Sequence, residues 1–108
     1  GMLNYPMCNQ TVTLYRRVGD SVQRQVLDGC FYRFEDSAAE DRFTRKFLLI
    51  CPGNREIRPG DRVLEGIGPE DVVWAEFLPI AVPGLGEVAY AAPWRWDGQI
   101  VHWEAGRK

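Results

Sequence analysis

The sequence predicts a small, mainly β protein with an antiparallel, barrel-like fold and at most one short helix. Its 108 residues match the size of one domain, which we place at residues 10–108 behind an extended N-terminal arm, residues 2–9. Short runs of alternating apolar and polar residues are separated by turns rich in glycine, proline and aspartate, which is typical of hairpins. We therefore expect about five to seven strands, closed or nearly closed into a barrel.

The first predicted hairpin follows the arm. Thr11–Arg17 alternates and is rich in residues that favour strands, which indicates a half-buried strand. Gly19-Asp20 marks a turn, and Ser21–Leu27 is the returning strand. A three-residue loop would pair Val12 with Val26, whereas a two-residue loop would shift the register by one residue. We favour the three-residue loop, because it brings apolar side chains together.

Two further strands are predicted before the middle of the chain. Cys30–Glu35 carries aromatic residues on both faces and follows Asp28-Gly29, which is either a turn or a bulge. Phe43–Cys51 is the strongest strand candidate, since it starts with alternation and ends in a continuous apolar run. That pattern indicates a strand that enters a core covered on both sides. Residues 36–42 form either a loop or one helical turn.

The stretch Ile57–Gly66 is predicted to organise the sheet. Pro59 and Gly60 suit the two central positions of a type II turn, because proline presets φ and glycine accepts a positive φ. A short strand, Arg62–Glu65, follows this turn. The tight turn determines which face of that strand points into the core.

The one helix candidate is residues 69–78. Pro69 and two acidic residues suit the first turn of a helix, and Val73 and Phe77 are spaced four residues apart. The β-branched residues and the tryptophan of this stretch also fit a strand; of the two we favour the helix. Ile80–Leu85 contains proline and is predicted to be a connection.

The C-terminal hairpin is predicted around Asp97-Gly98, a favoured two-residue turn. An uninterrupted register then places Trp94, Trp96 and Trp103 on one face. Such a face could stack on bases or sugars, or contact a partner subunit. We favour the interpretation that it covers the core, because tryptophan buries a large apolar area.

Composition and charge argue against several classes of protein, although they do not exclude a local basic patch. Thirteen basic and fifteen acidic side chains give a formal net charge of −2, whereas a dedicated nucleic-acid-binding domain is usually basic. Three scattered cysteines and one histidine do not match a zinc site or a disulfide framework, and we expect reduced thiols in a cytosol. We expect no cofactor, no signal peptide and no membrane span, since the longest nearly uncharged stretch is short and contains two prolines.

Few residues could carry catalysis. His102 could act as a general base, but no serine or cysteine lies at a recognisable spacing from it. Cys30 and Cys51 lie in apolar strand contexts and are interpreted as core residues, and Cys8 is the thiol expected to be exposed. The basic residues lie near acidic ones, so we interpret them as solvated surface residues. We predict no enzyme activity, no catalytic residues and no metal ligands.

Five segments in order resemble the small minor capsid proteins of tailed phages and prophages. A first strand, Thr11–Tyr15, precedes a Val-Leu-x-Gly-x-Phe/Tyr segment at Val26–Tyr32. Leu49–Pro52 is similar to a Leu-Ile-Pro element, with Cys51 inserted, and Ile57–Gly66 is similar to a Pro-Gly-Asp block ending in glycine. Val101–Gly106 is similar to a terminal His-Trp-x-x-x-Gly strand.

This resemblance implies a structural head–tail junction protein, a minor capsid or head-closure connector subunit. Such a subunit assembles into a ring with itself and with portal, head and tail proteins, in the host cytoplasm and then in the virion, without catalysis or cofactor. We expect the arm, residues 36–42 and the 80–85 connection to make the contacts. The candidate interface residues are Tyr5, Asp36, Ala39, Arg42, Val82 and Leu85.

Two alternatives remain at the level of sequence. The first is a small β-barrel that binds nucleic acid through the tryptophan face and scattered basic strand residues, whereas the head–tail interpretation predicts no sequence-specific nucleic acid and no membrane as partners. The second is an enzyme built on a cysteine and His102.

Overall fold

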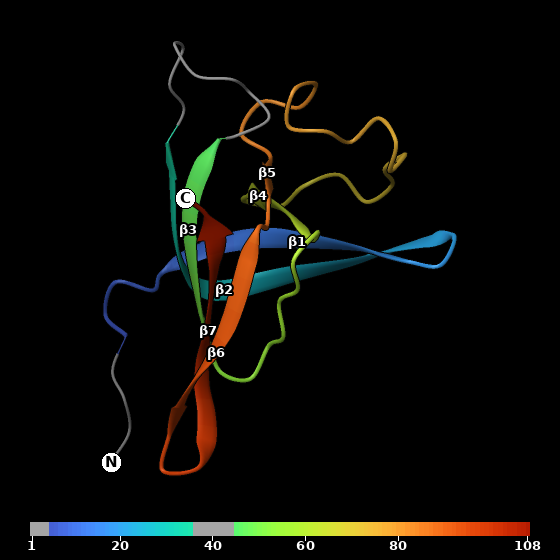
Figure 1. Cartoon of the computed structure of the whole chain (residues 1–108). Coiled ribbons are helices and arrows are strands. Elements are labelled where there is room, and N and C mark those ends of the chain that lie inside the picture. Colours follow the sequence, from blue (N-terminus) through green and yellow to red (C-terminus); the bar gives the residue numbers. More distant parts are fainter. Residues whose placement is uncertain (1–4, 36–44) are drawn as a thin grey trace.

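The computed structural model describes residues 5–35 and 45–108, and it confirms the predicted fold class (Figure 1). Within these residues there is no helix, and seven antiparallel strands form a sheet curled into a half-barrel. The strands are β1 (Gln10–Val18), β2 (Ser21–Glu35), β3 (Lys46–Pro52), β4 (Arg62–Glu65), β5 (Gly86–Glu87), β6 (Tyr90–Trp96) and β7 (Gln99–Arg107). The predicted interface residues Asp36, Ala39 and Arg42 lie outside the described residues, as does the beginning of the strand predicted over Phe43–Cys51.

The long strand β2 bends the sheet. The strand order is β5-β4-β1-β2-β3-β7-β6, and β2 pairs with β1 through its first part and with β3 through its second. Gly29 lies between these parts with φ of 67°, and the β1–β2 register shifts between Gln10 and Val12. Asp28-Gly29 is therefore a bulge inside a continuous strand rather than a turn, and the bulge lets the sheet curl.

The two ends of the strand order are joined through residues 88 and 89. Only Val88 and Ala89 separate β5 from β6. The Val88 amide donates to the Asp61 carbonyl at 2.8 Å, and the Ala89 amide donates to the Gly106 carbonyl at 2.8 Å. The chain thus passes directly from the β4 side of the curled sheet to the β7 side, as Figure 1 shows.

The β1–β2 hairpin has the two-residue loop, so the three-residue loop that we favoured is wrong. Val18 pairs with Ser21, and Leu14 pairs with Gln25. Gly19 has φ of 61°, and a glycine with positive φ at the first central position is the pattern of a type II′ turn, whose twist matches that of the strands. Turn geometry therefore outweighed the pairing of apolar residues. In this register the Arg24 guanidinium donates a hydrogen bond to the Gly68 carbonyl at 2.6 Å.

The main core fills the concave side of the curled sheet. It contains apolar residues from β1, β2, β3, β4 and β7 and from two connections: Val12, Leu14, Leu27, Cys30, Tyr32, Phe47, Leu49, Cys51, Ile57, Val63, Val88 and Ala105. Along β3 the buried positions alternate with half-buried ones, as the period of a strand requires. The predicted placement of Cys30 and Cys51 in the core is confirmed, since neither side chain is exposed.

A second core lies on the other face of β1, under the connection formed by residues 66–85. Tyr15, Phe77 and Leu85 are buried there, and the Tyr15 and Phe77 rings meet edge to face with centroids 4.6 Å apart. The Tyr15 hydroxyl donates to the Pro69 carbonyl at 2.7 Å. β1 is therefore buried on both faces, whereas its alternating sequence predicted burial on one.

Residues 69–78 form turns, so the favoured helix is wrong. The Phe77 amide donates to the Val73 carbonyl at 2.9 Å, but this single turn does not continue. The Arg62 guanidinium donates hydrogen bonds to two carbonyls of this stretch, that of Trp74 at 2.6 Å and that of Phe77 at 2.7 Å. It also lies over the Trp74 ring, 3.7 Å from the ring centre. These tertiary bonds replace the bonds that a helix would make between its own carbonyls and amides.

The central turn has the predicted geometry. The Asp61 amide donates to the Arg58 carbonyl at 3.0 Å across Pro59 and Gly60, and Gly60 has φ of 92°. The strand that follows, β4, spans the predicted Arg62–Glu65. This turn places the Asp61 side chain against Arg16 of β1, and Asp61 is only 2% exposed.

Candidate functional site

The β6–β7 hairpin projects from the body of the protein and carries two exposed tryptophans. It extends away from the half-barrel and ends in the Asp97-Gly98 turn (Figure 1). Trp94 is 54% exposed and Trp96 is 59% exposed. Strand alternation places both on the same side of β6. Large aromatic side chains that are more than half exposed at a projecting end offer contact area for another molecule.

The predicted face of three tryptophans is split by a bulge. Trp96 pairs with Gln99 as predicted, but Trp94 pairs with His102, because Val101 is an extra residue in β7. The carbonyl of Val101 accepts a hydrogen bond from the Gly53 amide at 2.7 Å. A one-residue shift moves side chains to the opposite face. Trp103 therefore lies on the other side from Trp94.

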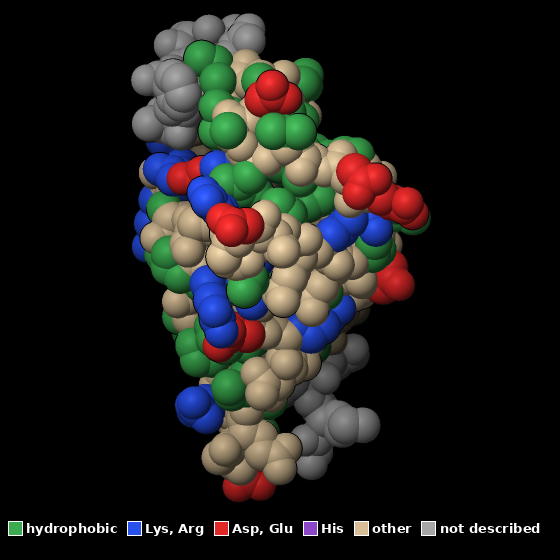
Figure 2. All heavy atoms as spheres, turned by 90° about the vertical axis from the view of Figure 1, so that its right-hand side faces the viewer, with side chains coloured by type: hydrophobic (Ala, Val, Ile, Leu, Met, Phe, Trp, Pro, Cys, Tyr) green, Lys and Arg blue, Asp and Glu red, His purple; other side chains and the backbone are tan. Residues whose placement is uncertain are grey.

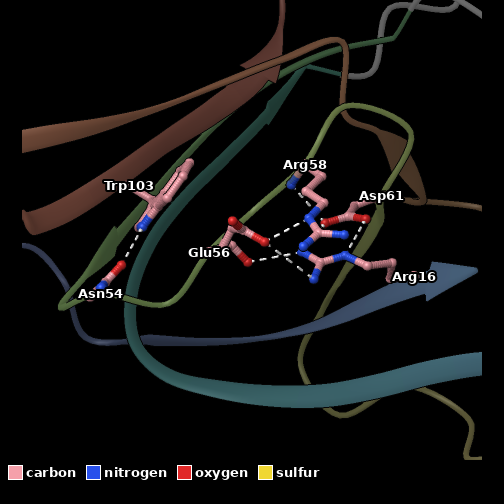
Figure 3. A network of polar contacts seen from close by, with 6 residues as sticks. All are labelled: Arg16, Asn54, Glu56, Arg58, Asp61 and Trp103. Carbon is pink, nitrogen blue, oxygen red and sulfur yellow. Dashed lines mark hydrogen bonds and ion pairs between the residues drawn. The ribbon is translucent and has the colours of Figure 1, made fainter. Parts of the chain in front are cut away.

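Trp103 belongs to the body of the protein. It packs against the main core, and its indole Nε1 donates to Asn54 Oδ1 at 3.1 Å (Figure 3). The interpretation of a tryptophan covering the core is thus right for Trp103 and wrong for the exposed Trp94 and Trp96.

His102 fastens the N-terminal segment to the sheet. Its Nδ1 lies 2.7 Å from the Tyr5 hydroxyl, which donates to it when the neutral ring carries its proton on Nε2. The Tyr5 ring meets the imidazole edge on at 5.4 Å, and the Trp94 ring stacks on it at 5.6 Å. Burial lowers the pKa of His102, and the nearby Glu104 partly opposes this effect. Sequence patterns could not reveal a contact between residues 97 positions apart.

An apolar groove lies between the N-terminal segment and the convex side of the sheet. Its volume is about 310 Å³. It is lined by Tyr5, Pro6, Met7, Cys8, Phe31, Ile50 and His102. Met7 at its rim is 68% exposed. The predicted interface residue Tyr5 thus lies beside exposed apolar surface and near the tryptophans of the hairpin.

The 66–85 connection offers a second apolar surface, but through other residues than predicted. Leu85 is fully buried and Val82 packs against the second core, so these side chains hold the connection to β1 and β4. The side chains that face solvent are Ile67, Val73 and Ile80, of which Ile67 is 77% exposed. Figure 2 shows hydrophobic side chains gathered in the upper part of this face, on the side where Figure 1 places the connection.

The basic residues around the central turn are paired within the chain. Arg16 on β1 makes a two-pronged contact with Asp61, at 2.9 and 2.8 Å (Figure 3). The hydrogen bond with Asp61 raises the pKa of Arg16. Arg58 contacts Glu56 at 2.6 Å. This network fixes the turn and leaves little free positive charge there, as the neighbouring acidic residues led us to expect.

A less compensated basic hollow lies at the other end of the sheet. Its volume is about 270 Å³, and it is lined by Arg33, Glu35, Lys46, Phe47, Leu48, Arg107 and Lys108. Arg107 is paired with Glu87 at 3.7 Å. Among the described residues that line the hollow, the other basic side chains are those of Arg33, Lys46 and Lys108, and the acidic one is that of Glu35.

The described residues contain no group of three or more histidine, cysteine, aspartate or glutamate side chains placed to hold a metal ion. They also contain no helix long and apolar enough to cross a membrane. Comparison with family models, curated proteins and solved structures gave no match.

Proposed function

We propose that this chain is a structural subunit of the head–tail junction of a tailed phage or prophage, a minor capsid or head-closure protein. It assembles into a ring with portal, head and tail proteins in the host cytoplasm and remains in the virion. The resemblance of the segments at Thr11–Tyr15, Val26–Tyr32, Leu49–Pro52, Ile57–Gly66 and Val101–Gly106 to minor capsid proteins supports this proposal.

The observation that carries the proposal is the exposed pair Trp94 and Trp96 at the end of a projecting hairpin. Single apolar residues on a surface are ordinary, but tryptophan is enriched at the centres of protein interfaces, where it supplies much of the binding energy. A hairpin that projects from the body can reach a neighbouring subunit. A net charge of −2 gives no general attraction to DNA, which suits a ring through which DNA passes.

The position of the histidine agrees with a role without catalysis. His102 is held between Tyr5 and Trp94 by a hydrogen bond and two ring contacts. Its role in the structure is to fasten the N-terminal segment. This accounts for the histidine without a reaction.

The experiment is reconstitution with the products of the neighbouring genes. Genes for portal, capsid or tail proteins beside this one supply the partners to be purified, and association is measured by size-exclusion chromatography with light scattering and by electron microscopy. We expect a ring-shaped complex that the double substitution W94A/W96A weakens at least about tenfold, as loss of two central tryptophans would. The matched control V18A, which truncates an exposed apolar residue at the end of the other long hairpin, should bind like the wild type.

Two outcomes would contradict the proposal. One is a set of neighbouring genes for metabolism or RNA processing. The other is the absence of any complex between the purified chain and the junction proteins. A chain that is monomeric by itself is compatible with the proposal, because such a subunit can require its partner for assembly.

The basic hollow favours a second candidate function, binding of single-stranded nucleic acid. Arg33, Lys46 and Lys108 could contact phosphates there. Titration of a labelled oligonucleotide at increasing salt tests this function, since binding through phosphates weakens steeply with salt. Binding that K46E abolishes would favour this candidate over the head–tail role, and no binding at low salt would remove it.

A further inference from the structure

Two cysteines that no proposed role uses meet in the main core. Cys30 on β2 and Cys51 on β3 have their Sγ atoms 3.6 Å apart, and neither residue is exposed to solvent. β2 and β3 are antiparallel neighbours in which Phe31 pairs with Ile50. One more step along this register sets Cys30 opposite Cys51.

The backbone at this position suits a disulfide bond. Directly opposite residues of antiparallel strands have Cα atoms about 4.5–5.5 Å apart, which lies within the range that disulfides span. The sulfur atoms would have to approach each other by roughly 1.5 Å to reach bonding distance. Cys30 directly follows the bulge at Gly29, where the ladder is interrupted. A side-chain rotation with a small local shift of β2 is therefore sufficient.

A cation lies beside this thiol pair. Arg55 Nη2 is 3.8 Å from Cys30 Sγ, and the same guanidinium donates to the carbonyls of Asp28 at 2.8 Å and Pro52 at 2.9 Å. Arg55 is half-buried, so the thiol pair lies one side chain below the surface. The hydrogen bond shared with Cys51 and the nearby Arg55 lower the pKa of Cys30, whereas the same hydrogen bond and burial raise the pKa of Cys51. Cys30 is thus the thiol that reacts first.

We propose that Cys30 and Cys51 are a redox-active pair that forms a reversible disulfide in the folded protein when a small disulfide such as oxidised glutathione is present. Because neither thiol is exposed, the half-buried Arg55 side chain must first move aside. The Cys30 thiolate then attacks one sulfur of oxidised glutathione, which breaks the S–S bond and releases one glutathione thiolate. Cys51 then loses its proton and attacks the Cys30 sulfur of the mixed disulfide, which releases the second glutathione. Two protein thiols are oxidised and one glutathione disulfide is reduced to two thiols, so that electrons and protons balance.

The bond would staple the bent strand β2 to β3. It would link residues that are 21 positions apart in the sequence, across the place where β2 passes from β1 to β3. This inference does not depend on the proposed function. For a protein that leaves a reducing cytoplasm, the bond would form after release and strengthen the fold outside the cell.

The test is oxidation of the reduced, folded full-length chain with oxidised glutathione, followed by intact-mass measurement, thiol titration and peptide mapping. We expect the mass to fall by two hydrogen atoms and one thiol, that of Cys8, to remain titratable. The mapped peptides should join Cys30 to Cys51, and the melting temperature should rise by roughly 10 °C and return after reduction.

The cysteine variants give matched controls. C8S should still lose two hydrogen atoms, whereas C30S and C51S should not form an intramolecular bond. R55Q should slow the oxidation several-fold, because it removes the cation beside Cys30. The proposal is overturned if the folded wild type keeps all three thiols after prolonged exposure, or if the bond maps to Cys8. Because the wild-type map decides the question, poor folding of a variant does not prevent the test.

Discussion

The two long hairpins of this protein end alike and are used differently. β1–β2 and β6–β7 both close through a two-residue turn, at Gly19-Asp20 and at Asp97-Gly98. In the first hairpin the middle of β1 is buried on both faces, by the main core and by the 66–85 connection. In the second hairpin, residues Ala92–Gln99 are exposed although two of them are tryptophans. Apolar character alone therefore does not indicate burial; the deciding factor is whether another segment covers the strand.

This comparison separates stability from interaction. The first hairpin contributes to the free energy of folding, because the Tyr15 ring is enclosed and its hydroxyl donates to a carbonyl of the connection. The second hairpin keeps its aromatic area available for another molecule. Truncation inside the first hairpin should therefore destabilise the fold far more than truncation at the tip of the second.

The largest effect is expected from Y15A in the first hairpin. Tyr15 is fully buried, contacts Phe77 edge to face and donates to the Pro69 carbonyl. Its truncation leaves a cavity in the second core and should lower the free energy of unfolding by about 4 kcal/mol. Urea denaturation followed by tryptophan fluorescence measures the change. A loss below about 1 kcal/mol would mean that the 66–85 connection does not enclose β1.

A smaller loss is expected from D61N, which disturbs the tie between the first hairpin and the central turn. Asp61 is almost fully buried and accepts two hydrogen bonds from Arg16 and one from the Arg58 amide. Removal of its charge leaves Arg16 with only Glu56, so we expect a cost of about 2–3 kcal/mol. The control E56Q changes an exposed partner and should cost less than about 1 kcal/mol. Equal effects of the two variants would show that burial of the pair does not matter.

In the second hairpin the expected stability effect depends on pH. Burial lowers the pKa of His102 from its ordinary value of 6.5, so the unfolded chain binds its proton more readily than the folded chain does. The contribution of neutral His102 to the free energy of unfolding is complete above about pH 6.5, and it decreases as the pH falls toward the lower pKa of the folded state. Urea midpoints should therefore decrease between about pH 7.5 and about pH 5.5 more in the wild type than in H102Q. If the urea midpoint of H102Q fell more steeply than that of the wild type, the pKa of His102 would be raised by folding and not lowered.

The smallest effect is expected from W96A at the tip of the second hairpin. Although tryptophan is larger than tyrosine, Trp96 is 59% exposed, so its truncation should change the free energy of unfolding by no more than about 0.5 kcal/mol. The loss of unfolding free energy caused by W96A should therefore be far smaller than the loss caused by Y15A. If W96A cost as much as Y15A, the hairpin tip would be part of the folded core.

Sequence patterns were sufficient for elements that local chemistry determines. The Pro59-Gly60 turn, the bounds of β4 and the Asp97-Gly98 turn follow from φ preferences of single residues, and all three are present. The same patterns failed where distant segments decide. The Trp94 register depended on a bulge tied to Gly53, and the conformation of residues 69–78 depended on the hydrogen bonds that Arg62 donates to two of their carbonyls. The β1–β2 register was mispredicted for a local reason, because the two-residue turn at Gly19-Asp20 outweighed the pairing of apolar residues.

The candidate site was predictable only in part. The sequence indicated the tryptophans as a set, and strand alternation was enough to place Trp94 and Trp96 together. It could not show that Trp103 turns inward, or that Tyr5 meets His102, since no local pattern links these positions. The meeting of Cys30 and Cys51 likewise depends on the pairing of β2 with β3.

By itself, the sequence of this protein determined a small antiparallel β fold, because the period of apolar residues and the turn residues act over a few neighbouring positions. The tertiary structure alone decided which faces are covered. Coverage depends on how a connection such as residues 66–85 packs over a strand and on single-residue shifts between strands, and each such shift moves a side chain from core to solvent. The packing of this connection buried Tyr15 and Leu85, and the bulge in β7 turned Trp103 toward the core, whereas Trp94 and Trp96 stay exposed at the end of the second hairpin.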